Sequence, residues 1–251
     1  MSVYVLIHGA WHGAFYWKKV IPLLERAGHI VKAPDLPGSG DDPTPTSQVS
    51  LKSCVDRVTE IIDSVAEPVI LVGHSMGGVV ITQAAEERPD KIAKLIYLAA
   101  FLPQNGQSLR DLAATDPASL VPTGFLVSAD GVEVALRQEM VRSAFYADCS
   151  EEDVADAKAR LRPQALAVLG TPVAISEERY GKVPRFYIHC TQDQAVTMTL
   201  QKAEVEAVPC RTFTLTTSHS PFYSDPEGLT RHLLAIGAGS AGCSPPRSPL
   251  S

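Results

Sequence analysis

The apolar residues of this chain are concentrated in short runs separated by longer mixed segments. The runs cover residues 3–7, 29–33, 69–72, 95–99, 185–189 and 211–215. Each is mostly apolar along its length instead of alternating with polar residues, which is typical of strands buried on both faces of a parallel sheet. The pattern therefore predicts six strands in one buried sheet.

Helices are predicted between these strands, at residues 17–27, 51–65, 76–87, 200–208 and 226–236. Strands and helices thus alternate over most of the chain. This alternation predicts an α/β fold with a mostly parallel, doubly wound sheet.

The alternation is interrupted after Phe101, where about eighty residues precede the next core strand. A connection of that length is expected to carry structure of its own. Residues 125–128 and 132–135 flank an Asp-Gly turn and predict a hairpin, and helices are predicted at 138–146 and 150–161, with Ser150 as the N-cap of the second.

We therefore divide the chain into a core, an inserted cap and a tail. The core comprises 1–104 and 183–236, the cap comprises 105–182, and the tail comprises 237–251. The tail is rich in Gly, Ser and Pro and is expected to be disordered. With 251 residues, of which 45% are hydrophobic, the rest of the chain is long enough for one compact domain.

Charge and targeting signals exclude several classes of partner. The net charge of -6 and the scattered Lys and Arg residues do not favour nucleic-acid binding. No apolar run reaches the roughly 18 residues of a membrane span, and no signal-peptide pattern opens the sequence. We therefore expect a cytoplasmic protein that acts on a small molecule.

The cysteines favour neither a disulfide framework nor a zinc site. They are odd in number, widely spaced and without a C-x-x-C pair, namely Cys54, Cys149, Cys190, Cys210 and Cys243. Five reduced thiols are expected, and no metal or cofactor is predicted.

One short motif predicts covalent chemistry at a serine. The motif is G-x-S-x-G, formed by Gly73, His74, Ser75, Met76 and Gly77. Such a motif arises by chance in roughly one chain in ten of this length, so alone it is a weak signal. Here it lies between a predicted strand and a predicted helix, which is the context of a nucleophile elbow. Ser75 is therefore the candidate nucleophile.

A serine hydroxyl needs a base within hydrogen-bonding reach, and three histidines follow Ser75 in the chain. His189 falls within a predicted strand and His232 within the last helix. His219 follows the last strand, at the sheet edge where the serine also emerges, and is the preferred base. The alternative is that His219 is a surface-loop histidine without a catalytic role.

The base needs an acid that orients it. In proteins with a nucleophile elbow of this kind, the acid lies between the serine and the histidine in the sequence. Asp193 follows the strand at 185–189 and fits that position. Its alternative role is that of a turn-forming aspartate. Asp35 is the main competitor, but it precedes Ser75 in the chain and is better explained by a turn.

An oxyanion needs two preorganised N–H donors. The backbone of Met76 is expected to supply one, and the backbone of Ala10, in the loop after the first strand, the other. His8 and His12 in that loop are a weak metal-site candidate, because no carboxylate or cysteine lies near them in the sequence.

The chain resembles the plant methylesterase and hydroxynitrile lyase group of the α/β-hydrolases and its bacterial esterase relatives. The similarity extends to about Ile236 and is carried by residues 5–13, 34–40, 73–77, 148–153 and 161–163. The resemblance implies an α/β-hydrolase fold with a cap inserted between core strands, and a Ser75, Asp193 and His219 triad.

The resemblance also separates two reactions. In the lyases a lysine follows the catalytic histidine and a threonine occupies the position of Gly9, whereas this chain has Ser220 and Gly9. The resemblance therefore implies the hydrolase branch.

The sequence thus predicts a carboxylesterase-type serine hydrolase that cleaves a small carboxylic ester through an acyl-enzyme. A cyanohydrin lyase, a lactonase or amide-cleaving variant, and a small-ligand receptor without catalysis are the alternatives. A homodimer is possible. Aromatic and apolar residues are expected to shape the pocket, namely Phe15, Phe125, Leu126, Phe145 and Tyr146.

Overall fold

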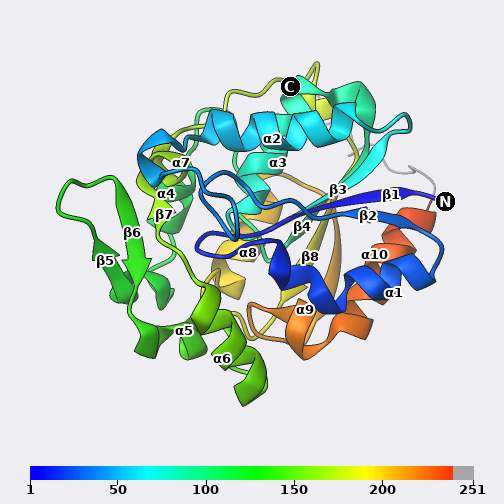
Figure 1. The fold of residues 1–251 in the computed structure, drawn as a ribbon. Helices are drawn as coiled ribbons and strands as arrows, with labels where there is room; N and C mark the ends of the chain where they lie inside the picture. Colours follow the sequence, from blue (N-terminus) through cyan, green and yellow to red (C-terminus); the bar gives the residue numbers. More distant parts are fainter. Residues whose placement is uncertain (240–251) are drawn as a thin grey trace.

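The computed structural model describes residues 1–239 and contains a central sheet of six strands. In sequence order these are β1 Val3–Ile7, β2 Ile30–Lys32, β3 Val69–His74, β4 Ile92–Leu98, β8 Arg185–Cys190 and β9 Arg211–Leu215. All neighbouring strands pair in parallel, in the spatial order β2-β1-β3-β4-β8-β9 (Figure 1). The six strands predicted from the apolar runs are confirmed.

Burial of the strands depends on their place in the sheet. The inner strands β1 and β3 are buried at every residue, which explains their uninterrupted apolar sequences. The edge strands β2 and β9 are partly exposed, so the expectation that all six strands are buried on both faces is wrong for these two. Each of these edge strands has a neighbouring strand on only one side. Part of the strand is therefore exposed, which allows polar residues such as Lys32 and Thr212.

Helices cover both faces of the sheet. They are α1 Ile21–Arg26, α2 Leu51–Asp63, α3 Gly77–Glu87, α8 Met198–Ala207, α9 Pro221–Ser224 and α10 Pro226–Ala238. Helices α2 and α3 pack together on one face, and α1 and α10 on the other (Figure 1). This is the doubly wound arrangement that the alternating pattern predicts.

The helix predicted at 17–27 is interrupted in the structure. A 3-10 helix, Ala14–Lys19, precedes α1, and Pro22 lies in the first turn of α1. Proline has no N–H to donate to the preceding turn, so a continuous α-helix through this position is disfavoured. The short helix α9 was not predicted.

The long connection between β4 and β8 carries its own structure beyond the carboxyl ends of the central strands (Figure 1). Its helices are α4 Leu109–Ala113, α5 Gln138–Phe145, α6 Glu151–Arg160 and α7 Leu166–Gly170. Its strands β5 Phe125–Val127, β6 Glu133–Leu136 and β7 Gln164–Ala165 form a separate antiparallel sheet. We keep the name cap for residues 105–182 as our interpretation of this segment.

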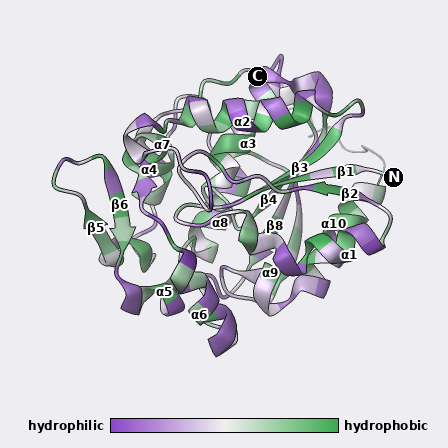
Figure 2. Ribbon diagram, viewed as in Figure 1, coloured by the Kyte–Doolittle hydropathy of each residue, from purple (hydrophilic) through white to green (hydrophobic). Residues whose placement is uncertain are grey.

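Two features predicted for the cap are present. Strands β5 and β6 form the expected hairpin, and the Ser150 side chain accepts a hydrogen bond from the Asp153 N–H at the start of α6. Figure 2 shows α6 as largely hydrophilic, in contrast to the central strands. Three cap elements, α4, α7 and β7, are too short to be recognised in the sequence.

The predicted start of the tail needs correction, because α10 continues to Ala238. The buried Lys94 ammonium group donates hydrogen bonds to the carbonyl oxygens of Ile236, Gly237 and Gly239. Uncapped carbonyls at a helix end are stabilised by a cation, which accounts for the longer helix. Residues 240–251, the rest of the predicted tail, lie outside the described residues.

Among residues 1–239, no helix is long and apolar enough to cross a membrane. The four cysteines in this part of the chain, Cys54, Cys149, Cys190 and Cys210, are not paired in disulfides.

Candidate active site

Ser75 lies on a tight turn between β3 and α3. Its φ of 53° is in the left-handed region, which is strained for any residue with a side chain. The turn passes close to the loop after β1, since a β-carbon on Gly77 would lie 2.8 Å from the Ile7 carbonyl oxygen. The structure therefore has the geometry of a nucleophile elbow at Ser75, the position that the motif indicates.

His219 and Asp193 come together below the surface. His219 lies in the loop after β9 and Asp193 in the loop after β8, and His219 Nδ1 is 2.7 Å from Asp193 Oδ2. Their side chains are only 1% and 0% exposed. A buried carboxylate in this position fixes the tautomer and orientation of the imidazole.

The other oxygen of Asp193 is also engaged. Asp193 Oδ1 accepts hydrogen bonds from the backbone N–H groups of Ala195, at 2.7 Å, and Val196, at 3.0 Å. These bonds orient the carboxylate so that Oδ2 faces His219. The aspartate thus has the local turn role considered in the sequence and, in addition, a histidine partner.

The ring centroid of His74, the residue before Ser75, lies 4.4 Å from that of His219. Within residues 1–239, Ser75 Oγ and His219 make no direct hydrogen bond. Catalytic hydrogen bonds are often long or poorly aligned before substrate binds, so the absence of this bond does not rule out His219 as the candidate base.

The competing residues have other partners. His189 contacts the Gln201 side chain, and His232 contacts the Thr214 carbonyl oxygen. Asp35 accepts hydrogen bonds from the N–H groups of Ala14 and Asp41 and so organises a turn. The preference for His219 and Asp193 over these residues agrees with the contacts.

The backbone amides of Ala10 and Met76, the two predicted oxyanion donors, lie at the same cavity and are unpaired in the described part of the chain. Both residues line the same cavity as Ser75. Within the described part of the chain, neither N–H donates a hydrogen bond to a protein acceptor. Two unpaired N–H donors beside a nucleophile are what a tetrahedral intermediate requires.

The rings of His8 and His12, the weak metal-site candidate, contact backbone groups. His8 Nδ1 contacts the Gly9 carbonyl oxygen and Nε2 accepts from the Leu36 N–H, while His12 Nδ1 contacts the Ala10 carbonyl oxygen. Burial lowers the pKa of both rings, so they are neutral. In residues 1–239, no group of three His, Cys, Asp or Glu residues is arranged to hold a metal ion.

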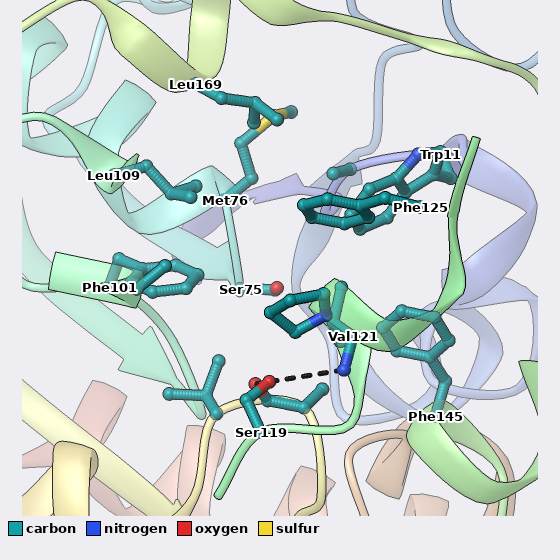
Figure 3. A pocket seen from close by; sticks show the side chains of 15 residues that line it. Trp11, Ser75, Met76, Phe101, Leu109, Ser119, Val121, Phe125, Phe145 and Leu169 are labelled. Carbon is teal, nitrogen blue, oxygen red and sulfur yellow. Dashed lines mark hydrogen bonds between the residues drawn. The ribbon is translucent and has the colours of Figure 1, made fainter. Parts of the chain in front are cut away.

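The cavity in front of Ser75 lies between core and cap. Figure 3 shows the Ser75 hydroxyl pointing into it, with Phe101 on one side and Phe125 on the other. The lining residues are Ala10, Trp11, Ser75, Met76, Phe101, Leu109, Ala113, Ser119, Val121, Pro122, Phe125, Phe145, Leu169, Ala195 and Val196. All of these side chains are uncharged, and all but the two serines and Trp11 are fully apolar.

The pocket residues expected from the sequence are only partly correct. Phe125 and Phe145 line the cavity. Leu126 is 44% exposed and Tyr146 is fully buried, and neither lines the cavity. Phe15 faces a different hollow, where the Arg160 guanidinium lies 5.4 Å from its ring centroid. An alternating strand such as β5 sends neighbouring side chains to opposite faces, which separates Phe125 from Leu126.

One important neighbour was missed by sequence reasoning. Gln201 on α8 is fully buried and binds the acid loop through several hydrogen bonds, including Nε2 to the Val196 carbonyl oxygen at 2.7 Å. It also approaches Asp193 Oδ2 at 3.4 Å. The only signal in the sequence is a polar residue on a predicted helix, which does not reveal the face on which it lies.

A parallel sheet in this strand order, with a serine on the turn after β3 and a buried His and Asp pair after later strands, defines an α/β hydrolase. The profile of the alpha/beta hydrolase family matches residues 4–231, and the chain belongs to this family. The predicted fold class is thereby confirmed.

Similar proteins indicate which kind of α/β hydrolase this chain resembles. Methylesterase 2 of Arabidopsis thaliana is 33% identical over 93% of this chain and 95% of its own length. Putative methylesterase 15, chloroplastic, of the same plant is 36% identical over 93% of this chain, which spans 56% of that protein. A pyrethroid hydrolase from Sphingobium faniae JZ-2 has a TM-score of 0.86 and 28% identity, covering 96% of this chain and 99% of the other.

These relatives confirm the resemblance to plant methylesterases and bacterial hydrolases that the sequence motifs carry. At the level of enzyme class, they show that the chain is a carboxylesterase-type hydrolase.

Proposed function

We propose that this protein hydrolyses a small, uncharged carboxylic ester through a covalent acyl-enzyme on Ser75, with His219 as general base and Asp193 as the acid that orients it. The observation that carries the proposal is the buried 2.7 Å contact between His219 and Asp193 beside a serine on a strained turn.

Acylation follows from the positions of these groups. Ser75 Oγ attacks the ester carbonyl carbon while His219 Nε2 takes the hydroxyl proton. The negative charge that forms on the carbonyl oxygen is stabilised by the N–H groups of Ala10 and Met76. As the tetrahedral intermediate collapses, the C–O bond to the alcohol breaks and His219 returns the proton to the leaving oxygen.

Deacylation repeats these steps with water. His219 removes a proton from a water molecule, the resulting hydroxide attacks the acyl carbon, and the proton passes to Ser75 Oγ as the acid leaves. Asp193 stabilises the imidazolium that forms in each half of the reaction. The residues present suffice for every step, so the proposal needs no cofactor or metal.

The cavity supports an apolar, uncharged substrate. Its lining holds no charged side chain that would pair with an ionic group, and desolvating an unpaired charge there would be costly. The product acid is ionised at neutral pH and has no cationic partner in the lining, which favours its release. The names of the relatives support an ester as the reacting bond.

The lyase alternative is disfavoured by Ser220, which follows His219 where the resemblance implies a lysine in lyases. A β-carbon on Gly9 would lie 2.9 Å from Ser75 Cβ, so a larger residue there would displace the nucleophile. Release of cyanide from mandelonitrile would revive the lyase. A lactonase is separated from an esterase by substrate profiling, and saturable ligand binding without turnover would indicate a receptor.

The test compares the wild type with Ser75→Ala on p-nitrophenyl acetate and butyrate, followed by mass spectrometry after exposure to a fluorophosphonate probe. We expect turnover and a label on the peptide containing Ser75, both lost in Ser75→Ala. Ser119→Ala is the matched control, because Ser119 lines the same cavity but its hydroxyl is bound to the Ala195 carbonyl oxygen, so labelling persists. A folded wild type with neither turnover nor label would refute the proposal.

A further inference from the structure

A turn of the cap contacts the loop that carries His219. The turn joins α5 to α6, and its Asp148 carboxylate accepts hydrogen bonds from both the backbone N–H of Ser218, at 2.8 Å, and the Ser218 hydroxyl. Ser218 is the residue immediately before His219 and is 1% exposed. A single cap side chain therefore fixes the backbone on one side of the proposed base.

The same stretch of the cap contacts the other side of His219 and its ring. Cys149 Sγ lies 3.9 Å from the carbonyl oxygen of Ser220, the next residue in the loop. The Phe145 ring centroid lies 5.5 Å from that of His219. The histidine loop is thus enclosed by the cap before, at and after the histidine.

The turn that carries Asp148 is itself anchored. The Cys149 N–H donates to the Tyr146 carbonyl oxygen, and the Ser150 side chain caps α6 by accepting from the Asp153 N–H. Asp153 in turn pairs with Lys19 of the core at 2.7 Å. Because these contacts connect the turn to the core, the Asp148 carboxylate is held in place before any substrate binds.

We propose that Asp148 is a positioning residue for His219, so that the cap sets the geometry of the base as well as the shape of the pocket. This inference rests on the proposed function of His219. Hydrogen bonds to a carboxylate are about twice as strong as those between neutral groups, and Asp148 makes two of them to one residue. Small misplacements of a catalytic group lower the rate steeply, so loosening Ser218 lowers kcat.

Asp148 differs from a purely structural contact in what its removal would change. It lies at the protein surface, so a variant at this position is expected to fold. A structural role would lower the melting temperature and leave kcat of the folded protein unchanged. A positioning role lowers kcat, leaves KM nearly unchanged because the pocket lining is intact, and is rescued by a residue that restores the hydrogen bonds.

The experiment compares Asp148→Ala, Asp148→Asn and the control Glu151→Ala. Glu151 is a neighbouring surface carboxylate whose side chain is 87% exposed and pairs with Arg142. The measurements are kcat and KM on p-nitrophenyl butyrate, the rate of fluorophosphonate labelling of Ser75, and the melting temperature.

We expect kcat and the labelling rate of Asp148→Ala to fall about tenfold with KM within about twofold of wild type. Asn accepts from the Ser218 N–H and donates to its hydroxyl, so Asp148→Asn should recover most of the rate. Glu151→Ala should match the wild type.

Wild-type kcat in Asp148→Ala, with or without a lower melting temperature, would overturn the positioning role, and so would a loss that Asn does not relieve. Failure of the proposed function has a different signature, since the wild type itself would then show no label at Ser75.

Discussion

His74 Nε2 lies 2.9 Å from the carbonyl oxygen of His219, so the residue before the proposed nucleophile binds the backbone of the proposed base. Burial lowers the pKa of His74 well below the usual value for histidine, and the neighbouring His219 lowers it further. The ring is therefore neutral, and with a carbonyl as its partner the proton resides on Nε2. This hydrogen bond joins the nucleophile elbow to the histidine loop, and its two residues are 145 positions apart in the sequence.

Replacing His74 with Phe removes the donor and keeps a ring of similar shape. The His219 carbonyl oxygen would then be buried without its partner, which costs about 1–3 kcal/mol of unfolding free energy. We expect that loss in urea unfolding and a lower kcat. His232→Phe is the matched control, because its ring contacts the Thr214 carbonyl oxygen in a solvent-exposed setting, and its cost should be small. Equal effects of the two substitutions would contradict the role of His74.

Replacing Asp193 with Asn keeps the shape of the side chain but favours the wrong tautomer of His219. We expect kcat to fall by roughly 10⁴-fold, as is typical when the acid of such a triad is neutralised. The melting temperature should change much less than the rate. Asp35→Asn tests the competitor, and a loss of activity in that variant with normal activity in Asp193→Asn would reverse the assignment.

Replacing Gln201 with Leu removes the amide that braces the acid loop. Its Nε2 group donates to the carbonyl oxygens of Cys190 and Val196, and its Oε1 accepts from the Cys190 N–H. Each of these buried groups that is left unpaired lowers the free energy of unfolding by about 1–3 kcal/mol. We expect a lower urea midpoint together with a lower kcat, whereas the exposed neighbour substitution Lys202→Leu should change neither. Unchanged kcat in Gln201→Leu would show that Asp193 does not depend on this brace.

Glu204 is expected to make stability depend on pH. Burial raises its pKa from 4.5 to about 8, and the nearby Asp116 adds to the effect. The folded state therefore binds a proton that the unfolded state releases between these values. The stabilisation is fully present below pH 4.5 and is lost as the pH rises through about 8.

The measurement is the free energy of unfolding in urea at several pH values for the wild type and Glu204→Gln. Gln cannot ionise, so the variant should gain stability relative to the wild type as the pH is raised towards 8, and the two should differ least in acid. A difference that does not change with pH would show that Glu204 titrates normally.

Much of the fold was determined by local sequence patterns. A strand buried between helices must be apolar on both faces, so β1, β3 and residues 95–98 of β4 stand out as continuous runs without knowledge of their partners. Two-residue β7 and five-residue α4 left no such signal, because their formation depends on neighbours distant in the chain. The positions of edge strands β2 and β9 in the sequence were predicted correctly, but their burial was overestimated. The sequence of a single strand does not reveal whether the strand lies at the edge of the sheet.

The candidate site divides in the same way. Ser75, Asp193 and His219 could be named from the sequence because each follows a strand, and the carboxyl ends of parallel strands meet at one edge of the sheet. The supporting contacts of His74, Gln201 and Asp148 could not. Each is a hydrogen bond that depends on side-chain direction and on the packing of a helix or turn from elsewhere in the chain, so only the tertiary structure decides it.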